Sequence, residues 1–500
     1  MGKWFRRQKG GQSNKDKNEP TFSELLEKCK ESKDFISFRQ GKSFSFYISY
    51  YKTLVNPDFI HRDLLSPITK HPIQSLDELK NLIPVENVTI TDDVKDIQDK
   101  LLSGFILVHE NETSARCALI PAIAVEKRQV TIPETEFSVV GPKESFVEAI
   151  DVNINMVRKR LPLPELYAKE ILVGKLSKTR VVVMYIQGIA NEDNISTVLQ
   201  RIKDIEFDQI IDSSFITQLM SDNHNSPFPQ LIDTERPDRT ASVLSEGKIA
   251  IFVDGSPQVL TGPTTLPEFF SAFEDYFTTW HIASFFRLLR LFSVMFSVLS
   301  SPIYVAVLTY HYQMIPKDLL SPLIASRSGI PFPPIMEAII LELTIELLRE
   351  AGARLPTKVG QTIGIVGGIV IGTAAVEAGL TSNVLLIIVA LAALASFTTP
   401  VYQMSNTIRI IRFPFLLAAQ FWGIVGVSMC FGFFLSHLLK LTSLGRPYVG
   451  PVYPLRLKDL KDSLYRLPFE KLSRRPMQLL PEDPIRFNKT RAEKKQDIDE

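Results

Sequence analysis

The sequence predicts a multidomain membrane protein with two small α/β soluble units followed by an α-helical transmembrane domain. Two observations support this fold class. Up to about Tyr276 the chain is polar, and strand-like segments alternate with helix-like ones. From about Trp280 to Lys440 apolar runs dominate, and beyond them the chain becomes basic again. At 500 residues the chain is also too long for a single ordinary domain.

These changes in composition divide the chain into five parts. We expect a basic flexible arm, two soluble α/β units, a transmembrane domain and a basic cytoplasmic tail. In the same order they cover residues 1–40, 41–162, 163–278, 279–440 and 441–500. The arm lacks the apolar stretch of a signal peptide. It fits a solvated tail, and the alternative is an arm that lies on anionic membrane lipid.

Three segments of the first soluble unit show a clear period. Residues 43–55 alternate and are rich in aromatic side chains, which is typical of a strand. Residues 103–122 place two apolar runs on either side of a polar turn and predict a hairpin. Residues 144–161 carry apolar side chains at helical spacing. The joint with the second unit is expected near residues 162–170.

The second soluble unit continues this alternation. Residues 179–190 are typical of a strand, and residues 191–211 predict an amphipathic helix with Asn194 as its N-cap. Residues 247–260 read as a strand, a tight turn and another strand. Because strands and helices alternate in both units, each unit is predicted to be a small α/β sandwich.

The soluble half carries no recognisable catalytic motif. It has no phosphate-binding glycine loop, no nucleophile elbow and no zinc-binding helix motif. The three cysteines lie far apart and match no metal spacing. We therefore expect a protein that is not an enzyme and has no cofactor or bound metal. The net charge of +1 gives no reason to expect nucleic acid as a partner.

One soluble stretch, "PFPQLIDTERPDRT" at residues 227–240, crowds charges around two prolines. Glu235, Arg236 and Asp238 are candidate contacts for a ligand or another subunit, since loops often carry function. The interpretation that we favour is a rigid loop held together by salt bridges among these residues and Arg239.

Four segments are long and apolar enough to span a membrane. They are residues 291–310, 360–380, 383–402 and 413–439, and Pro302 predicts a kink in the first. Residues 331–356 form a fifth candidate that is shorter and more polar.

Basic residues at the ends of these spans predict the orientation. Arg287 and Arg290 precede the first span, and a basic tail follows the last, so both termini should lie in the cytoplasm. An even number of spans follows, and we favour four, with residues 331–356 lying at the interface or re-entering the membrane. Arg409 and Arg412 would then face outward, against the rule. Five spans would place these two arginines inside but the tail outside.

The second predicted span has two distinct sides. Gly360, Gly364, Gly368 and Gly372 recur every fourth residue, which lets another helix approach closely. A different side is formed by Thr362, Val366, Ile369, Thr373 and Glu377. This side carries the hydroxyls of the two threonines and the carboxylate of the glutamate. We weigh packing within the chain against an oligomer interface on the glycine side and an aqueous path on the other.

The glutamate-bearing helix shows the same contrast. Glu342, Glu346 and Glu350 are four residues apart and form one stripe, which Arg349 and Arg354 can partly neutralise. One interpretation is an interfacial helix whose acids face water. The other is a ring of these acids, contributed by several subunits, at the mouth of a cation-conducting pore.

The chain resembles the A subunits of GerA-type spore germinant receptors. The stretches that carry the resemblance are "GPKESFVEAIDVNINMVRKRL", "PFPQLIDTERPDRT", "GKIAIFVDGSPQVL", "EDYF" and "PFPPIMEAIILELTIELLREAGARLP" with the following "GQTIGIVGGIVIGTAAVEAGL". They occur in family order from about residue 40 to 455. Ser145 departs from the family, which usually has glycine there.

The resemblance implies a multi-pass protein of the spore inner membrane that acts in germination after sporulation. It implies a transporter-like B subunit and a lipoprotein C subunit as partners, and self-association into a channel for monovalent cations. Two alternatives stay open. One is a non-conducting structural or accessory subunit, and the other is a secondary transporter, although no internal repeat is visible.

Overall fold

The computed structural model describes residues 21–40, 45–70, 75–83, 85, 88–122, 133, 136, 138–355, 357–456, 459–463 and 465–487. Side chains are described at these positions except at residues 70, 81, 357–366 and 461. The chain forms two compact units. The first comprises residues 1–129 and 151–170, and the second comprises residues 130–150 and 171–500.

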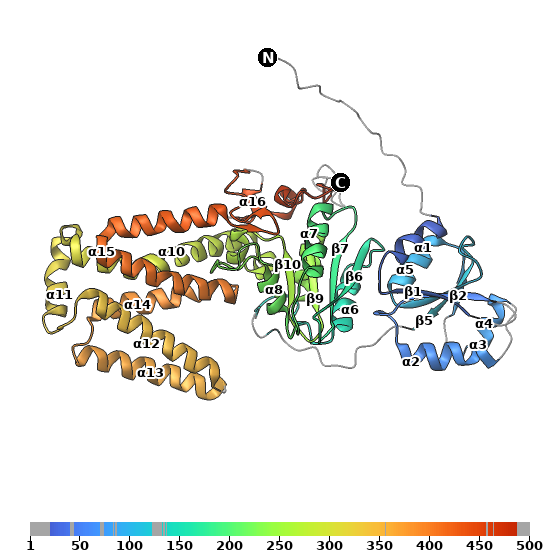
Figure 1. Ribbon diagram of the computed structural model, residues 1–500, viewed down its shortest axis with the longest axis horizontal. Coiled ribbons are helices and arrows are strands. Elements are labelled where there is room, and N and C mark those ends of the chain that lie inside the picture. Colours follow the sequence, from blue (N-terminus) through green and yellow to red (C-terminus); the bar gives the residue numbers. More distant parts are fainter. Residues whose placement is uncertain are drawn as a thin grey trace, which may run out of the picture. The chain divides into compact units, whose positions relative to one another are not determined.

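The first unit is built on an antiparallel sheet with the strand order β1-β2-β4-β5-β3 (Figure 1). Its elements are α1 (Phe22–Lys30), β1 (Phe35–Gln40), β2 (Phe46–Tyr51), α2 (Pro57–Phe59), a π-helical turn (Ile60–Leu65), α3 (Ser66–Lys70), α4 (Leu76–Leu82), β3 (Thr89–Thr91), α5 (Val94–Leu102), β4 (Phe105–His109), β5 (Cys117–Pro121) and α6 (Ile150–Arg160). The predicted strand and hairpin are β2 and the β4–β5 pair, which hydrogen-bond in register from Phe105↔Pro121 to His109↔Cys117.

Alternation along the strands creates a core on each face of this sheet. In β4, Ile106 and Val108 pack with the α2–α4 layer, whereas Leu107 packs with α1 and α5. Helix α1 falls inside the predicted flexible arm, so that prediction was wrong for residues 21–40. The reason is local, because Thr21 and Glu24 form a capping box and four apolar side chains of α1 are buried.

The second unit starts with another five-stranded sheet, in the order β6-β7-β9-β10-β8. Its elements are β6 (Leu166–Val173), which begins in the first unit, β7 (Thr179–Ile186), α7 (Glu192–Lys203), α8 (Ser213–Met220), β8 (Ile232–Thr234), α9 (Pro237–Ser245), β9 (Ile249–Val253) and β10 (Val259–Gly262). The predicted N-cap was wrong. Asn191, not Asn194, caps α7 by accepting a hydrogen bond from Asp193 N at 3.0 Å, while Asn194 is buried inside the helix.

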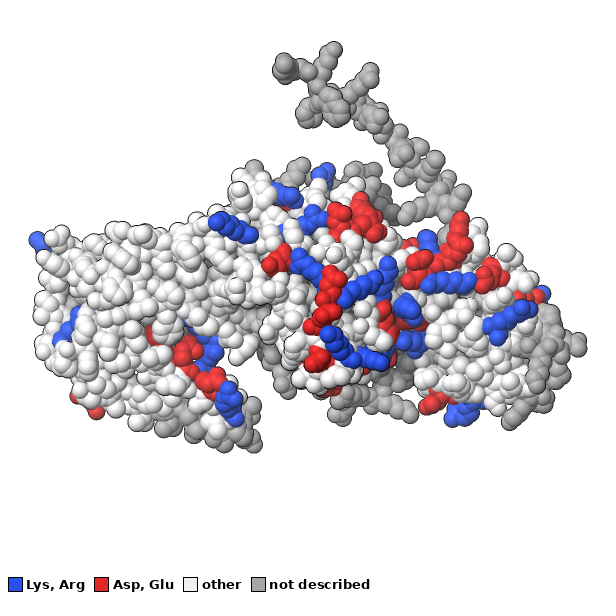
Figure 2. Space-filling view, in the orientation of Figure 1, with Lys and Arg blue, Asp and Glu red and all other residues white. Residues whose placement is uncertain are grey.

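Two 3-10 helices, Leu266–Phe270 and Phe273–Phe277, lead from this sheet into a helical bundle. The bundle contains α10 (Trp280–Tyr310), α11 (Lys317–Arg327), α12 (Pro334–Arg354), α13 (Thr357–Glu377), α14 (Asn383–Ser396) and α15 (Tyr402–Lys440). The chain then returns to the sheet through β11 (Thr442–Ser443), β12 (Arg446–Pro447), α16 (Leu460–Ser463) and two 3-10 turns (Phe469–Lys471 and Met477–Leu479). Figure 2 shows few charged side chains over the helices and many over the α/β elements.

Among the described residues, α10 and α15 are the helices long and apolar enough to cross a membrane, so four spans are not confirmed. Helix α15 is folded back on itself. Gly423 breaks it with a left-handed φ of 58°, and the rings of Phe415 and Phe434 stack at 5.6 Å. Two residues that far apart in one straight helix could not touch. The predicted single span at residues 413–439 is therefore wrong, because residues 402–422 and 424–440 form two antiparallel arms.

Contacts at the helix ends give the direction of α10 and α15. Helix α10 starts next to the 3-10 helix Phe273–Phe277 on the sheet side and ends at Tyr310 on the far side. The Tyr310 hydroxyl donates to Gln420 O at 2.8 Å, beside the break in α15. Both ends of α15 return to the sheet side, where Thr407 donates to Pro227 O and His437 lies 2.9 Å from Ser226 Oγ.

The intervening helices also cross the bundle. Helix α14 begins near α10's far end, where Ser382 Oγ lies 3.2 Å from Tyr304 Oη, and ends on the sheet side, where Ser396 O accepts from Ser405. Helix α12 runs parallel to α14, because Glu337 contacts Ser382, and α13 connects the two. With the two arms of α15, the described chain makes six passes. The four-span prediction had treated α12 as interfacial, whereas in the structure α12 runs through the bundle alongside α14.

Candidate functional site

The centre of the bundle contains a buried ion pair. Glu342 of α12 and Arg412 of α15 are each 2% exposed, and Arg412 Nη1 donates to Glu342 Oε2. Ser301 of α10 donates to Glu342 Oε1 at 2.9 Å, and Arg412 Nη2 donates to Ser297 Oγ at 2.7 Å. Three helices that are distant in sequence thus meet at one pair of charges.

A second acid–arginine contact lies toward the far side. Glu337 is fully buried, and its Oε1 accepts from Arg327 Nη2 of α11 at 2.9 Å. Its Oε2 accepts from the backbone N–H of Ser382, the N-cap of α14, at 3.0 Å. A carboxylate here also interacts favourably with the dipole of α14.

A third contact lies toward the sheet side. Glu346 Oε1 is 3.4 Å from Arg409 Nε of α15, and Glu346 Oε2 is 3.8 Å from Arg349 Nη1 of its own helix. Asn406 Oδ1 accepts hydrogen bonds from both arginines. We call the three contacts together, around Glu337, Glu342 and Glu346, the acid–arginine ladder.

The ladder is a device for holding helices together. Removing charges from water is costly, so buried charges persist when they are paired and hydrogen-bonded. Each carboxylate of the ladder reaches an arginine on another helix, in α11 or α15. The ion pairs of the ladder therefore fix α12 against α11 and α15.

The acid stripe predicted from sequence is divided among three environments. Glu342 is buried, Glu346 is half-buried, and Glu350 is exposed. Pairing with Arg349 and Arg354 is confirmed, since Arg354 Nη2 lies 2.5 Å from Glu350 Oε1. Sequence reasoning missed Arg327, Arg409 and Arg412 as partners. The signal was present, because Arg409 and Arg412 violated the orientation rule, and charges within apolar segments usually pair with one another.

Helix α13 carries the other predicted pore residues. Thr362, Val366, Gly360 and Gly364 have no described side-chain surroundings. Ile369, Thr373 and Glu377 are exposed on the single chain. No atom lies within 4 Å of an ideal Cβ at Gly368, and the nearest at Gly372 is Leu386 Cδ2 at 3.9 Å. Assignment of these residues to a pore or to an oligomer interface stays a prediction.

The predicted contact loop of the soluble half, residues 227–240, is held by hydrogen bonds and ion pairs to other residues of the same chain. Arg236 is 2% exposed, and its Nη2 donates to Asp238 Oδ2 at 2.7 Å and to Pro142 O at 3.1 Å. Glu235 O accepts from Phe146 N at 2.8 Å, and Arg239 pairs with Glu136. These bonds match the rigid, salt-bridged loop that was the favoured interpretation. A ligand or subunit contact at Glu235, Arg236 and Asp238 stays a prediction.

Asp233, at the edge of this loop, links the sheet to α15. Gln403 Nε2 of α15 donates to Asp233 Oδ2 at 3.2 Å. Burial, with a smaller contribution from the nearby Glu136, raises the pKa of this carboxyl to about 6, against the lowering effects of a backbone hydrogen bond and of Arg239. Unlike the acids of the ladder, Asp233 has no ion pair recorded among the described residues.

Comparison with known proteins identifies the family. Residues 23–478 match the model of the Bacillus/Clostridium GerA spore germination protein. The chain is 51% identical to spore germination protein GerQA of Bacillus cereus over 96% of each chain. It is 37% identical to spore germination protein A1 of Bacillus subtilis, over 89% of this chain and 93% of that one.

One solved structure is also similar to this chain. It is the N-terminal domain of the A subunit of the Bacillus megaterium spore germinant receptor GerK3, at 30% identity and a TM-score of 0.36. The match covers 49% of this chain and 94% of that chain. On the strength of the match across residues 23–478 and of these relatives, the chain belongs to the GerA spore germination protein family.

Proposed function

We propose that this chain is the A subunit of a nutrient-responsive spore germination receptor, and that several copies form a cation-conducting channel in the spore inner membrane. Relatives named as spore germination proteins support the role in germination. Two apolar helices of spanning length support the membrane location. In this proposal the chain works with a transporter-like B subunit and a lipoprotein C subunit, and monovalent cations pass when the nutrient is sensed.

The ladder and an apolar core fill the interior of a single chain. An ion path through one copy would have to pass through this filled interior. Buried apolar side chains from α10, α12, α14 and α15 form one continuous cluster, which includes Val305, Ala338, Leu385, Met404 and Phe415. A dry, packed interior of this kind does not conduct ions. A conducting path therefore has to form between copies, as in other symmetric rings.

The exposed side of α13 is the observation that carries the proposal. Thr373 and Glu377 are exposed on a helix that otherwise presents apolar side chains such as Ile369, Val370 and Ile371. The Thr373 hydroxyl already donates to Ile369 O at 2.8 Å, so it tolerates either lipid or water. The Glu377 carboxylate has no such internal bond among the described residues, and it is costly in lipid. A ring of copies would surround these groups with water and attract cations by their field.

Substitutions at two neighbouring glycines of α13 test whether copies of the chain associate into an oligomer. Gly368→Leu adds a side chain where this chain has nothing within 4 Å, so the monomer should fold. We expect it to abolish the oligomer in detergent and the potassium flux in liposomes that contain the chain and its partner subunits. Gly367→Leu is the matched control, because its Cβ would meet Leu348 at 2.8 Å within the same chain and should reduce monomer stability. A normal oligomer and normal flux in Gly368→Leu would contradict the proposal.

A non-conducting structural subunit is the second candidate, and the ladder favours it. Glu337, Glu342 and Glu346 are already paired with arginines, so their charge is not free to attract a cation. The double variant Glu342→Gln, Glu346→Gln tests whether these acids take part in conduction. Reduced flux at unchanged assembly supports conduction past these acids, whereas unchanged flux shows that any path avoids them.

A further inference from the structure

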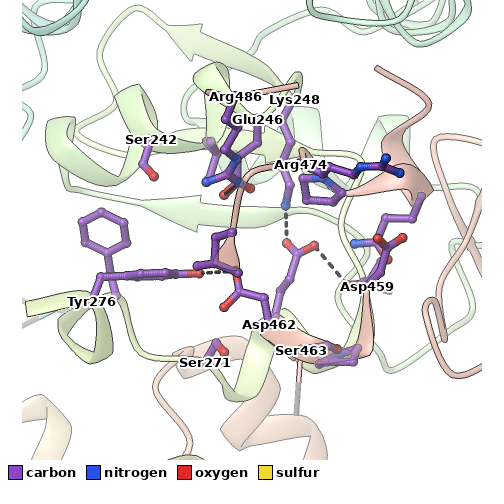
Figure 3. A pocket seen from close by; sticks show the side chains of 18 of the residues that line it. Ser242, Glu246, Lys248, Ser271, Tyr276, Asp459, Asp462, Ser463, Arg474 and Arg486 are labelled. Atoms are coloured by element: carbon purple, nitrogen blue, oxygen red, sulfur yellow. Dashed lines mark hydrogen bonds and ion pairs between the residues drawn. The ribbon is translucent and has the colours of Figure 1, made fainter. Parts of the chain in front are cut away.

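A cavity of about 400 Å³ lies between the second sheet and the segment that follows the last membrane-type helix. Helix α9, the turn that follows it with Glu246 and Lys248, and the 3-10 helices Leu266–Phe270 and Phe273–Phe277 form one wall. Residues 459–463 and 471–478, with Arg486, form the other. Figure 3 shows Glu246 and Lys248 from the first wall facing Asp459, Asp462 and Ser463 from the second. Small-molecule sites typically enclose 300–1,000 Å³, and this volume falls in that range.

Most charged groups of this cavity are already paired, some within one wall and others across the cavity. Lys248 pairs with Glu268, and Arg486 Nη2 lies 2.8 Å from Glu246 Oε1. The Tyr276 hydroxyl donates to Asp462 Oδ2 at 3.2 Å. These pairs explain how the C-terminal segment is held against the sheet, and they leave a different set of groups free.

Three buried polar atoms of the cavity have no hydrogen-bond partner among the described residues. They are Asp459 Oδ2, Gln478 Oε1 and Ser463 Oγ. Two of them can only accept hydrogen bonds, and the hydroxyl can accept as well. Burial raises the pKa of Asp459, while the backbone of Met477 and Gln478 lowers it. Buried acceptors of this kind are costly unless a donor reaches them.

We propose that the cavity binds a small organic amine in its ammonium form, held by Asp459, Gln478 and Ser463. An ammonium group is a compact cation with three N–H donors, which matches one carboxylate and two neutral oxygens. The cavity is far larger than a single ion needs, because a water molecule occupies only about 30 Å³. An organic body therefore fits beside the ammonium group. The exposed cations Lys471 and Arg474 on the same wall can receive a carboxylate if the amine carries one.

The bound amine would lie next to the first helix of the bundle. Ser463 and its neighbour Asp462 belong to the short helix α16. Asp462 O accepts from Arg287 of α10, whose Nε also donates to Asp275 Oδ2 at 3.1 Å. An amine that moves α16 would therefore move a direct contact of α10. This inference goes beyond the proposed channel, and it is tested without measuring flux.

Titration calorimetry on the purified full-length chain in detergent tests the site. The probes are methylammonium, glycine and acetate, each in a background of potassium chloride. We expect methylammonium and glycine to bind and acetate not to bind. Asp459→Asn keeps the shape of the side chain and should weaken methylammonium at least about tenfold, since hydrogen bonds to charged groups are among the strongest. Glu482→Gln is the matched control, an exposed carboxylate of the same segment outside the cavity, and should bind as the unaltered chain does.

Three outcomes would overturn the proposal. The first is that neither amine binds, and the second is that Asp459→Asn binds methylammonium as tightly as the unaltered chain does. The third is displacement of methylammonium by potassium at equal concentration, which would show a simple cation site. Gln478→Met serves as a second variant if Asp459→Asn does not fold, and it should weaken both amines while leaving the helical content unchanged.

Discussion

Two buried ion pairs, one in each unit, use the same groups in different ways. In the first unit, Arg158 holds Asp34 through two parallel bonds, from Nε to Oδ2 at 2.6 Å and from Nη2 to Oδ1 at 2.7 Å. Ser32 and Thr53 also donate to that carboxylate. In the bundle, Arg412 binds one oxygen of Glu342 through Nη1 and donates from Nη2 to Ser297 instead.

The difference teaches how to interpret an acid in an apolar helix. The pair in the first unit is bidentate and links Arg158 of helix α6 to Asp34, just before β1, in one fixed geometry. The pair in the bundle joins three helices through single bonds. Both arginines leave one nitrogen without a partner among the described residues, Arg158 Nη1 and Arg412 Nε. The acid of α12 is thus first a structural link between helices, and a role in conduction requires that the link be altered.

The largest effect is expected in the first unit. Asp34→Ala would leave Arg158, which is 1% exposed, without its partner. Breaking a buried pair on one side costs about 3–5 kcal/mol. Pulse proteolysis across a urea titration of the full chain measures the loss, with Glu27→Ala, an exposed acid of α1, as control. A loss below about 1 kcal/mol would show that the bidentate pair does not stabilise this unit.

A somewhat smaller effect is expected in the bundle. Glu342→Ala should cost about 2.5–3.5 kcal/mol, the range for a charge left in the middle of a membrane helix. Replacing both partners, as Glu342→Leu with Arg412→Leu, should restore most of that stability, because no unpaired charge remains. Thermal loss of helical circular dichroism in detergent measures both variants. If the double variant is as unstable as the single one, the serines rather than the ion pair hold these helices.

Asp233 extends the comparison to an acid that makes no ion pair with an arginine among the described residues. Its pKa is raised from 3.8 to about 6, so the folded state binds more protons than the unfolded state between these pH values. Stability should therefore fall as pH rises from 4 to 6, by about 2 kcal/mol. Asp233→Asn should remove this fall. A pH profile that is the same in both proteins would show that the carboxyl is not desolvated at the contact with α15.

The smallest effect is expected at the fold of α15. Gly423→Ala places a side chain at a left-handed position, which costs about 1–2 kcal/mol, and its Cβ would lie 2.9 Å from His311 Nε2. Gly432→Ala is the control, since no atom lies within 4 Å of its Cβ and a helical alanine is favoured by up to about 1 kcal/mol. Thermal unfolding in detergent compares the two. An unchanged midpoint for Gly423→Ala would contradict the hairpin.

Periodic segments of this chain could be predicted, and pairings between distant segments could not. The alternation in residues 43–55 and 103–122 predicted β2 and the β4–β5 hairpin, because strand pleating is a local property. The fold of α15 was missed because Gly423 lies in an apolar run with no turn residue beside it. Any helix tolerates a glycine, and tertiary contacts with Tyr310 and His311 decide whether the chain turns there.

The same distinction holds for the candidate site: features set by the local helical period could be predicted, and contacts between distant segments could not. Spacing by four placed Glu342, Glu346 and Glu350 on one stripe, because the helical period is fixed by the backbone. Which segment covers that stripe depends on the packing of helices, so Arg412, seventy residues along the chain from Glu342, could not be found from period alone. The cavity around Asp459 was missed because its two walls come from the sheet and from the C-terminal segment, which had been predicted only as a basic tail.

Cysteine accessibility at α13 tests the central claim most directly, that copies of this chain enclose a cation path lined by the exposed side of α13. Thr373→Cys is prepared with Cys430→Ser, reconstituted with the partner subunits, and treated with a water-soluble cationic thiol reagent. Phe433→Cys, which is 70% exposed on the apolar surface of α15, is the matched control. The account predicts that the reagent modifies Cys at position 373 and blocks nutrient-triggered potassium flux, while the control is neither modified nor blocked. Full flux after complete modification of position 373 would contradict it.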